Sequence, residues 1–128
     1  MTARVLVVDD ATTVRLYHGT LLRAAGFDVA EAANGLEAVE AALAGDYDLF
    51  VVDVNMPKMD GYTCVETLRR ETGSADAPIV MISTEERPDD AARAYAAGAN
   101  LYLVKPVAAE RLVRVAKMLT AGGGKPDR

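Results

Sequence analysis

The sequence of 128 residues has no tryptophan, two phenylalanines, one histidine and one cysteine. The single Cys64 excludes an internal disulfide and suits a reducing cell interior, so we expect a cytoplasmic protein. Acidic residues outnumber basic ones by 19 to 14, and the formal net charge of −5 argues against a dedicated nucleic-acid binder, because phosphate contacts need a basic face. No apolar run approaches the roughly 20 residues that cross a bilayer, and the first run, in MTARVLVVDD, is too short for a signal peptide.

What the chain does contain is the balance of a globular protein, with 51% apolar and 26% charged residues. Its length fits one domain of ordinary size, which buries most of the surface that the unfolded chain exposes. We expect residues 1–121 to form this domain as a monomer. We expect the glycine-rich end GGGKPDR (122–128) to be a flexible tail, with no second domain after it.

Five short apolar runs predict strands. They are RVLVV (4–8), FDVAEA (27–32), DLFVV (48–52), PIVMIS (78–83) and NLYLV (100–104). Around 4–8, 49–52 and 79–82 the runs are continuously apolar instead of alternating, which is typical of strands covered on both faces, as in a parallel sheet.

Amphipathic stretches between these runs predict helices at about 14–25, 36–44, 61–72, 88–97 and 112–119. The apolar repeat is Val14, Tyr17, Leu21 and Ala25 in the first helix, and Ala91, Ala92, Tyr95 and Ala96 in the fourth. Strict alternation of strand and helix predicts a flavodoxin-like (βα)5 fold of the α/β class, with a doubly wound, five-stranded parallel sheet in the order 2-1-3-4-5. In such a sheet the functional site lies beyond the carboxyl ends of the strands, near the switch point.

Polar residues stand where four of the predicted strands end. Asp9 and Asp10 follow the first strand, Asp53 the third, Ser83 the fourth and Lys105 the fifth. Because the carboxyl ends of parallel strands meet at one edge of the sheet, we expect these side chains to converge. Two carboxylates about 4 Å apart repel by about 4 kcal/mol at an effective dielectric constant near 20, so three of them require counter-charge. Lys105 supplies one positive charge, and a divalent cation would supply the rest.

The chemistry of these residues indicates phosphoryl transfer. Oxygen ligands without histidine or cysteine among them favour Mg²⁺, with Mn²⁺ as the alternative ion, and disfavour zinc. A carboxylate is itself a nucleophile that forms an aspartyl phosphate, and Asp53 is the best candidate because it alone ends the middle strand. The metal ion, Lys105 and the Ser83 hydroxyl would stabilise charge on the transferring group.

Four motifs follow one another along the chain: VLVVDD, VVDVNMPKMDG, VMIST and GANLYLVKP. Together they resemble the motifs of response-regulator receiver domains, and most closely those of the stand-alone chemotaxis (CheY-like) type, over residues 3–121. The resemblance implies that Asp53 is the phospho-acceptor. It also implies that Asp9, Asp10, Asp53 and the backbone carbonyl of Asn55 bind the metal ion.

The resemblance assigns roles to further residues around the phosphoryl group. It implies that Ser83 and Lys105 stabilise that group, and that Ser83 and Tyr102 form the conformational switch. It implies that Asn55 and Glu85 tune the rate of dephosphorylation.

Three positions near the end of the predicted site bear on its local geometry. The resemblance implies a cis bond between Lys105 and Pro106, which proline makes accessible. Thr84 stands where many members have alanine or glycine, which narrows access to the phosphoryl group. Val107 stands where phenylalanine is common, which alters the packing of the last loop.

The function implied by the resemblance is that of a single-domain response regulator, a signalling module and not an enzyme. A histidine kinase or a histidine phosphotransfer protein would donate the phosphoryl group, and a phosphatase is a further expected partner. We expect phosphorylation to change the face of the predicted fourth helix, fifth strand and fifth helix, which then binds a flagellar motor switch protein. Arg93, Arg114 and Lys117 are expected to give this face positive charge for an acidic partner.

Other functions stay open from the sequence alone. A phosphate sink or phosphorelay intermediate would carry the same motifs. A phosphatase with an aspartyl nucleophile would need a second acid where Asn55 stands, and an FMN carrier of this fold would bring Asp9 and Asp10 against its phosphate. Away from the site, we expect His18 on a helix surface and Cys64 packed inward.

Overall fold

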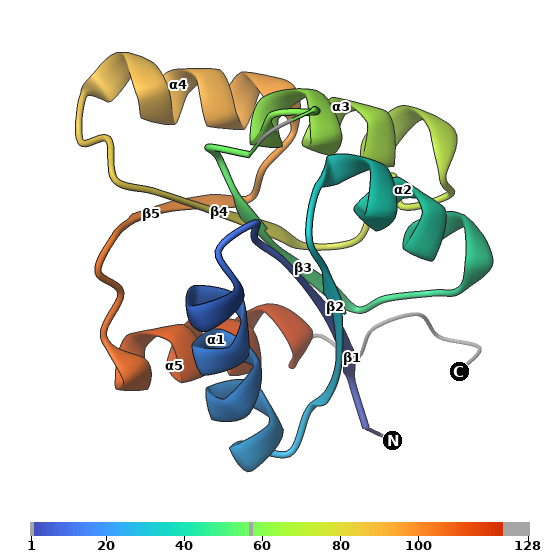
Figure 1. The fold of residues 1–128 in the computed structure, drawn as a ribbon, viewed down its shortest axis with the longest axis vertical. Helices are drawn as coiled ribbons and strands as arrows, with labels where there is room; N and C mark the ends of the chain where they lie inside the picture. The colour runs from blue at the N-terminus through green and yellow to red at the C-terminus, as the bar shows by residue number, and fades with distance from the viewer. Residues whose placement is uncertain (1, 57, 122–128) are drawn as a thin grey trace.

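The computed structural model describes residues 2–56 and 58–121, so the predicted tail at 122–128 lies outside the described residues. Within them, five strands alternate with five helices (Figure 1). The strands are β1 (Arg4–Val8), β2 (Asp28–Ala32), β3 (Leu49–Asp53), β4 (Ile79–Ser83) and β5 (Leu101–Val104). The helices are α1 (Thr12–Ala24), α2 (Gly35–Ala44), α3 (Gly61–Glu71), α4 (Pro88–Ala97) and α5 (Ala109–Thr120).

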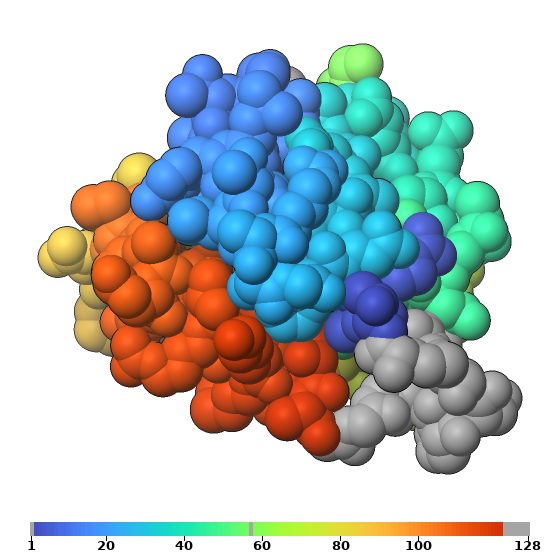
Figure 2. All heavy atoms as spheres, turned by 90° about the horizontal axis from the view of Figure 1, so that it is seen from below, coloured from blue at the N-terminus to red at the C-terminus, as the bar shows by residue number. Residues whose placement is uncertain are grey.

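The sheet is parallel throughout and has the strand order β2-β1-β3-β4-β5, which confirms the predicted flavodoxin-like α/β fold. Helices α1 and α5 cover one face of the sheet, and α2, α3 and α4 cover the other (Figure 1). Seen from below, α1 and α5 lie side by side (Figure 2). No helix of the described residues is long and apolar enough to cross a membrane.

Two apolar clusters fill the space between the sheet and its helices. Leu6, Phe50 and Met81 belong to the cluster under α2, α3 and α4, and their neighbours in sequence belong to the cluster under α1 and α5. Since successive side chains of a strand point to opposite faces, both sets are buried only when both faces are covered. This explains why the apolar runs of β1, β3 and β4 are continuous.

The inward face of α1 differs from the predicted one. The Tyr17 side chain, placed inside by the apolar repeat, is 52% exposed, whereas His18, expected on the surface, is only 5% exposed. A Cβ atom at the buried Gly19 would lie 3.2 Å from Arg23 Nη1 and 3.5 Å from Glu31 Oε2. Gly19 therefore lies where α1 comes close to Glu31 of β2, a contact that an apolar repeat does not predict.

The buried side of α4 also differs from its apolar repeat. Ala94 and Ala97 are buried, while Ala92 and Ala96 are exposed and Tyr95 is 47% exposed. The helix packs on α3 and β5. Alanine occurs on exposed and buried helix surfaces alike. In a helix rich in alanine, hydrophobicity therefore does not show which face is buried.

Glycines follow α1 and α4 where these helices end. Gly26 has φ +100° and Gly98 has φ +120°, a left-handed backbone that other residues rarely adopt. Cys64 on α3 is fully buried, as expected, and burial raises the pKa of its thiol to about 12.

Candidate functional site

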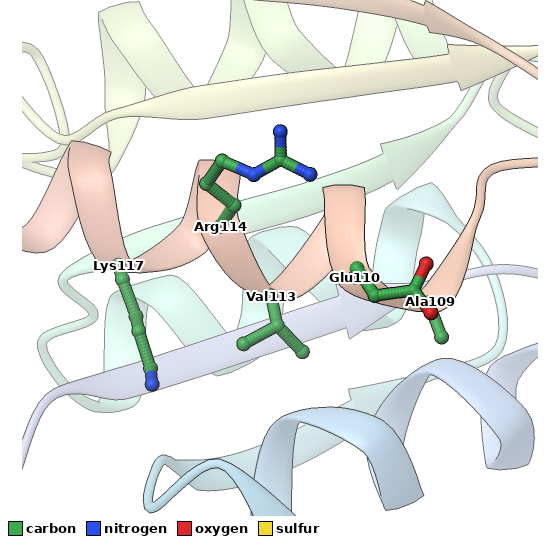
Figure 3. Close-up of a pocket in the computed structure, with 5 residues that line it drawn as sticks. All are labelled: Ala109, Glu110, Val113, Arg114 and Lys117. Atoms are coloured by element: carbon green, nitrogen blue, oxygen red, sulfur yellow. The ribbon is translucent and has the colours of Figure 1, made fainter.

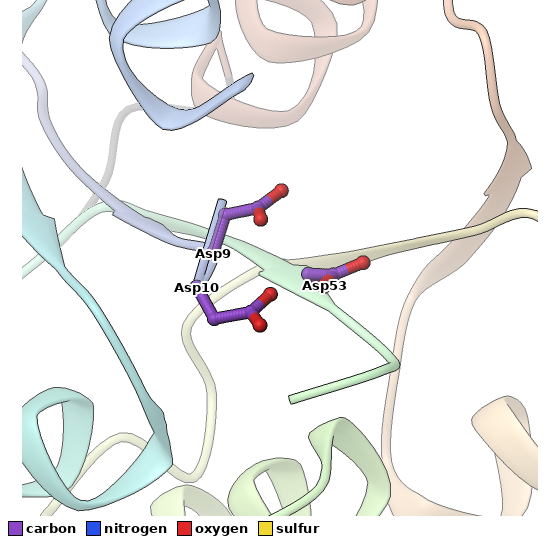
Figure 4. A group of neighbouring side chains, drawn as sticks. All are labelled: Asp9, Asp10 and Asp53. Carbon is purple, nitrogen blue, oxygen red and sulfur yellow. The ribbon is translucent and has the colours of Figure 1, made fainter. Parts of the chain in front are cut away.

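Three carboxylates meet at the carboxyl edge of the two central strands. Val8 of β1 pairs with Val52 of β3, so the residues that follow, Asp9 and Asp53, lie beside one another. Asp10 comes next in the chain, and carboxylate oxygens of the three acids lie within 4.8 Å of one another. Figure 4 shows the three side chains projecting to the same side of the strand ends. This is the convergence that the sequence predicts.

Lys105 brings positive charge to this cluster from the end of β5. Its Nζ lies 2.9 Å from Asp53 Oδ1 and 3.5 Å from Asp9 Oδ2. Asp9 and Asp53 are 3% and 5% exposed, and Asp10 is exposed. The two buried carboxylates therefore share one ammonium group.

The surroundings shift the pKa of both partners in the closest ion pair. Burial raises the pKa of the Asp53 carboxyl, and the charges of Asp9 and Asp10 add to this, although the hydrogen bond from Lys105 opposes it. Burial by itself lowers the pKa of the Lys105 ammonium, but its hydrogen bond to Asp53 and the charges of Asp53 and Asp9 outweigh burial and leave this pKa raised. The site thus holds more negative charge than Lys105 balances, which favours a bound cation.

The donor atoms fit magnesium. A cluster of carboxylate oxygens that is partly open to water suits a hard divalent cation that keeps some of its waters. Asp9, Asp10 and Asp53 would supply three such oxygen ligands. Asn55, whose backbone carbonyl is the fourth predicted ligand, lies two residues after Asp53 and has an exposed side chain.

Gly61 lets the first turn of α3 pack directly behind Asp53. Its N–H donates to the carbonyl of Val54 at 2.8 Å. A Cβ atom at this position would lie 2.7 Å from Val54 Cα and would overlap the Asp53 carbonyl oxygen. The Asp60 side chain caps the helix by accepting from Thr63 N–H at 2.9 Å. The first turn of α3 therefore packs tightly against the backbone at the end of β3.

A chain of hydrogen bonds links the two predicted switch residues. Ser83, fully buried at the end of β4, accepts a hydrogen bond at its Oγ from the Glu85 N–H at 3.1 Å. The Glu85 carbonyl accepts one from the Tyr102 hydroxyl at 2.8 Å. Tyr102 is partly buried and packs against the apolar cluster under α2, α3 and α4. Ser83 and Tyr102 therefore connect through the backbone of one loop residue.

The loops around the cleft contain the other predicted positions. Glu85 and Thr84 are exposed on the loop that leaves β4. The Lys105–Pro106 bond is cis, as predicted. Val107 is 9% exposed and packs in the apolar cluster under α1 and α5.

A hollow of about 350 Å³ borders Lys105. Its lining residues are Val14, Tyr17, His18, Thr84, Lys105, Pro106 and Val107. Burial lowers the pKa of the His18 imidazole and the charge of Lys105 adds to this, although Asp9 opposes it. The sequence predicts this histidine on a helix surface, and only the packing of α1 shows that it lies beside the cleft.

The predicted positive charge of the α4, β5 and α5 face is only partly observed. A shallow hollow of about 500 Å³ on α5 is lined by Ala109, Glu110, Val113, Arg114 and Lys117, and Figure 3 shows the Arg114 and Lys117 side chains leaving the helix in different directions. The Arg93 guanidinium lies 4.2 Å from the centre of the Tyr62 ring. This contact places Arg93 between α4 and α3, because the cation is attracted to the ring face.

Known proteins are similar to this chain over most of its length. The family model of the response regulator receiver domain matches residues 5–117. The transcriptional regulatory protein PrrA of Mycobacterium tuberculosis is 41% identical over 121 residues, which make up 94% of this chain and 51% of PrrA. The chain thus spans about half the length of this curated relative.

Solved structures show the same fold. The chemotaxis protein CheY4 of Vibrio cholerae superposes with a TM-score of 0.89 at 35% identity, over 93% of this chain and 99% of CheY4. The receiver domain of the sensor histidine kinase PA1611 from Pseudomonas aeruginosa has a TM-score of 0.87 at 26% identity, over 94% of this chain and 99% of that domain. That structure has a magnesium ion coordinated in its active site cleft.

Proposed function

Because this chain belongs to the family of response regulator receiver domains, we propose that it is a single-domain response regulator phosphorylated on Asp53. Members of this family are phosphorylation switches of two-component systems that histidine kinases phosphorylate, and they are not true enzymes. The observation that carries the proposal is the Lys105 ammonium, 2.9 Å from Asp53 Oδ1 inside a cluster of three acids. We assign the receiver domain to residues 1–121 of a monomeric, cytoplasmic protein, with 122–128 as its tail.

The proposed reaction is transfer of a phosphoryl group from a phosphohistidine to Asp53. A carboxylate oxygen of Asp53 attacks phosphorus, the P–N bond breaks, and the leaving imidazole nitrogen takes a proton from water. Lys105 already donates to Asp53 and can stabilise the negative charge on the transferring group. Hydrolysis by attack of water on phosphorus returns the free carboxylate.

Asp9, Asp10, Asp53 and the backbone carbonyl of Asn55 would hold Mg²⁺, or Mn²⁺ in its place. The bound cation would neutralise the acids and the phosphoryl oxygens during transfer. Asp9 is well placed for this, because its Oδ1 is fixed by the Ala11 N–H at 2.9 Å and its Oδ2 stays near Lys105.

The proposed switch is the hydrogen-bonded chain from Ser83 to Tyr102. Phosphorylation adds about 1.5 to 2 negative charges at the end of β3, which attract the Ser83 hydroxyl and Lys105. When Ser83 turns toward the phosphoryl group, its bond to the Glu85 N–H is released, and the loop that anchors the Tyr102 hydroxyl can move. Shifting a two-state equilibrium from 1:99 to 99:1 takes about 5.5 kcal/mol, which several charge-assisted hydrogen bonds can supply.

Asn55 and Glu85 are proposed to set the dephosphorylation rate. Both side chains are exposed on loops that leave neighbouring strands, β3 and β4. They are therefore available to the water that attacks the phosphoryl group, and to a phosphatase that brings its own side chain.

The proposed output is binding of a flagellar motor switch protein by the face of α4, β5 and α5. The similarity to CheY4, described as a chemotaxis protein, over nearly the full length of both chains supports this target. Arg114 and Lys117 on the exposed side of α5 offer charge for an acidic partner. A phosphatase with an aspartyl nucleophile is a weaker alternative, because Asn55 cannot act as its general acid.

A role as a phosphate sink or phosphorelay intermediate is the second candidate. The similarity to the receiver domain of the sensor histidine kinase PA1611 favours it, since that receiver is part of a kinase. Incubation with an autophosphorylated histidine kinase tests both roles at their first step, and we expect transfer of one phosphate to this chain. Capture of partners by the phosphorylated protein separates them, since recovery of a motor switch protein supports the first role and recovery of a histidine phosphotransfer domain supports the second.

A further inference from the structure

Arg15 on α1 joins the end of β1 to the neighbouring strand β2. Its Nη1 donates to the backbone carbonyl of Asp9 at 2.7 Å, and its Nε donates to Glu31 Oε1 at 3.1 Å. The Arg15 and Glu31 side chains are 15% and 21% exposed, so this ion pair is largely shielded from water. The Glu31 carboxylate balances the positive charge of the guanidinium. Arg15 therefore contacts the backbone at the acidic cluster but adds no net positive charge there.

The contact fixes the peptide unit between Asp9 and Asp10. On the other side of Asp9, the backbone N–H donates to the Ala32 carbonyl at 3.1 Å. The Asp10 carboxylate has no hydrogen bond or ion pair within residues 2–56 and 58–121, although its oxygens lie within 4.8 Å of those of Asp9 and Asp53. The direction of the Asp10 side chain therefore depends on its backbone, which begins at the peptide that Arg15 holds.

We propose that Arg15 is a positioning residue for cation binding, which holds the Asp9–Asp10 peptide so that the Asp10 carboxylate faces the metal site. This inference rests on the proposed function, because it presumes a cation at the three acids. Groups that orient metal ligands typically change metal affinity by about 10- to 100-fold when they are removed. The fork of the guanidinium suits the task, since one planar group reaches a carbonyl and a carboxylate together.

Arg23 provides a matched control on the same helix. Its Nη2 donates to the other oxygen of Glu31 at 3.1 Å and to the Val29 carbonyl at 3.2 Å. It therefore shares the carboxylate partner of Arg15 and the packing between α1 and β2, but neither of these two hydrogen bonds reaches Asp9. A general loosening of α1 would affect both arginine variants, whereas loss of peptide positioning would affect only Arg15.

The test is titration of the purified chain with MgCl2 by isothermal calorimetry, for the wild type, Arg15→Gln, Arg23→Gln and Glu31→Gln. We expect Arg15→Gln to weaken Mg²⁺ binding by about tenfold, and Arg23→Gln to bind as the wild type does. Glu31→Gln, which weakens the anchor of Arg15, should shift affinity in the same direction by a smaller factor. At saturating Mg²⁺, the maximal phosphorylation rate of Arg15→Gln by acetyl phosphate should stay within about twofold of the wild type, because only ligand positioning was lost.

Two results would overturn the inference. One is wild-type affinity for Mg²⁺ in Arg15→Gln, and the other is equal weakening in Arg15→Gln and Arg23→Gln. Melting temperatures in a chelator confirm that the variants are folded. Absence of Mg²⁺ binding by the wild type would instead overturn the proposed metal site itself, so the two failures are distinguishable.

Discussion

Lys105, directly after β5, meets Asp53, the last residue of β3, with Nζ 2.9 Å from Oδ1, although 52 positions separate them in the chain. The contact exists because β4 lies between their strands in the sheet, so both strand ends open onto the same cleft. Asp9 shares the same ammonium at 3.5 Å. The ion pair is at once the main counter-charge of the acids and the feature that marks Asp53 among the acids of the chain.

Replacing Lys105 by glutamine should destabilise the protein most when no metal ion is present. The two buried carboxylates would lose their shared counter-charge, at a cost of about 2 to 3 kcal/mol in the free energy of unfolding. Urea unfolding in a chelator and in excess Mg²⁺ measures this, and the loss should be smaller with Mg²⁺. Lys117→Gln, at an exposed position on α5, is the control and should change stability little. A Lys105→Gln loss that is the same in both conditions would contradict the shared-charge account.

Magnesium should stabilise the folded protein through the three acids. At a concentration 100 times the dissociation constant, a ligand that binds only the folded state raises the free energy of unfolding by about 2.7 kcal/mol. Thermal unfolding of the wild type with and without chelator measures the effect. Asp10→Asn should lose most of it, whereas Glu40→Gln, at an exposed acid on α2, should keep it. Equal stabilisation of the two variants would place the cation elsewhere.

His18 should titrate below the usual value of 6.5, because burial disfavours its charged form. A histidine whose folded pKa is lowered binds fewer protons in the folded state than in the unfolded state. Its contribution to stability is therefore complete above pH 6.5 and is lost as the pH falls from there toward the folded pKa. His18→Gln should lose less stability than the wild type over this interval. Because the chain has one histidine, its NMR signal reports the pKa directly, and a value at or above 6.5 would contradict the buried placement.

Gly61→Ala should destabilise the domain, because the added methyl group meets the backbone of Val54 at 2.7 Å, and backbone atoms cannot yield as the end of a side chain can. Overpacking of this kind costs about 1 to 3 kcal/mol. Gly45→Ala is a suitable control, since its Cβ would meet only the end of the Arg4 side chain, at 3.3 Å. Chemical unfolding of both variants measures the difference. Equal stability of the two would show that α3 does not press against the end of β3.

The sheet and its acidic edge were predictable from the sequence because both depend on local patterns. Continuous apolar runs mark strands covered on both faces, and alternation with helices then brings Asp9, Asp10 and Asp53 to one edge. The position of Lys105 follows from the same rule, since it also ends a strand. Each of these predictions required only the positions at which the strands end, and not the packing of side chains.

The network around α1 was not predictable in this way. Arg15 and His18 are polar residues on a helix, and hydrophobic periodicity assigns such residues to the outer surface. Their inward placement depends on Glu31 of β2 and on the cleft beside Lys105, which the sequence does not place against α1. The sequence did contain one sign of this placement, because α1 carries an arginine, a histidine and a glycine on one side. That pattern can be interpreted only when the strand that packs against it is known.

The phosphorylation site is tested most directly by incubation with acetyl phosphate and Mg²⁺, followed by mass spectrometry of the intact protein. The wild type and Asp76→Asn, at an exposed acid outside the cleft, should each gain one phosphate that alkali removes. Asp53→Asn should gain none. Phosphorylation of Asp53→Asn at the wild-type rate would contradict the central claim that Asp53 is the acceptor.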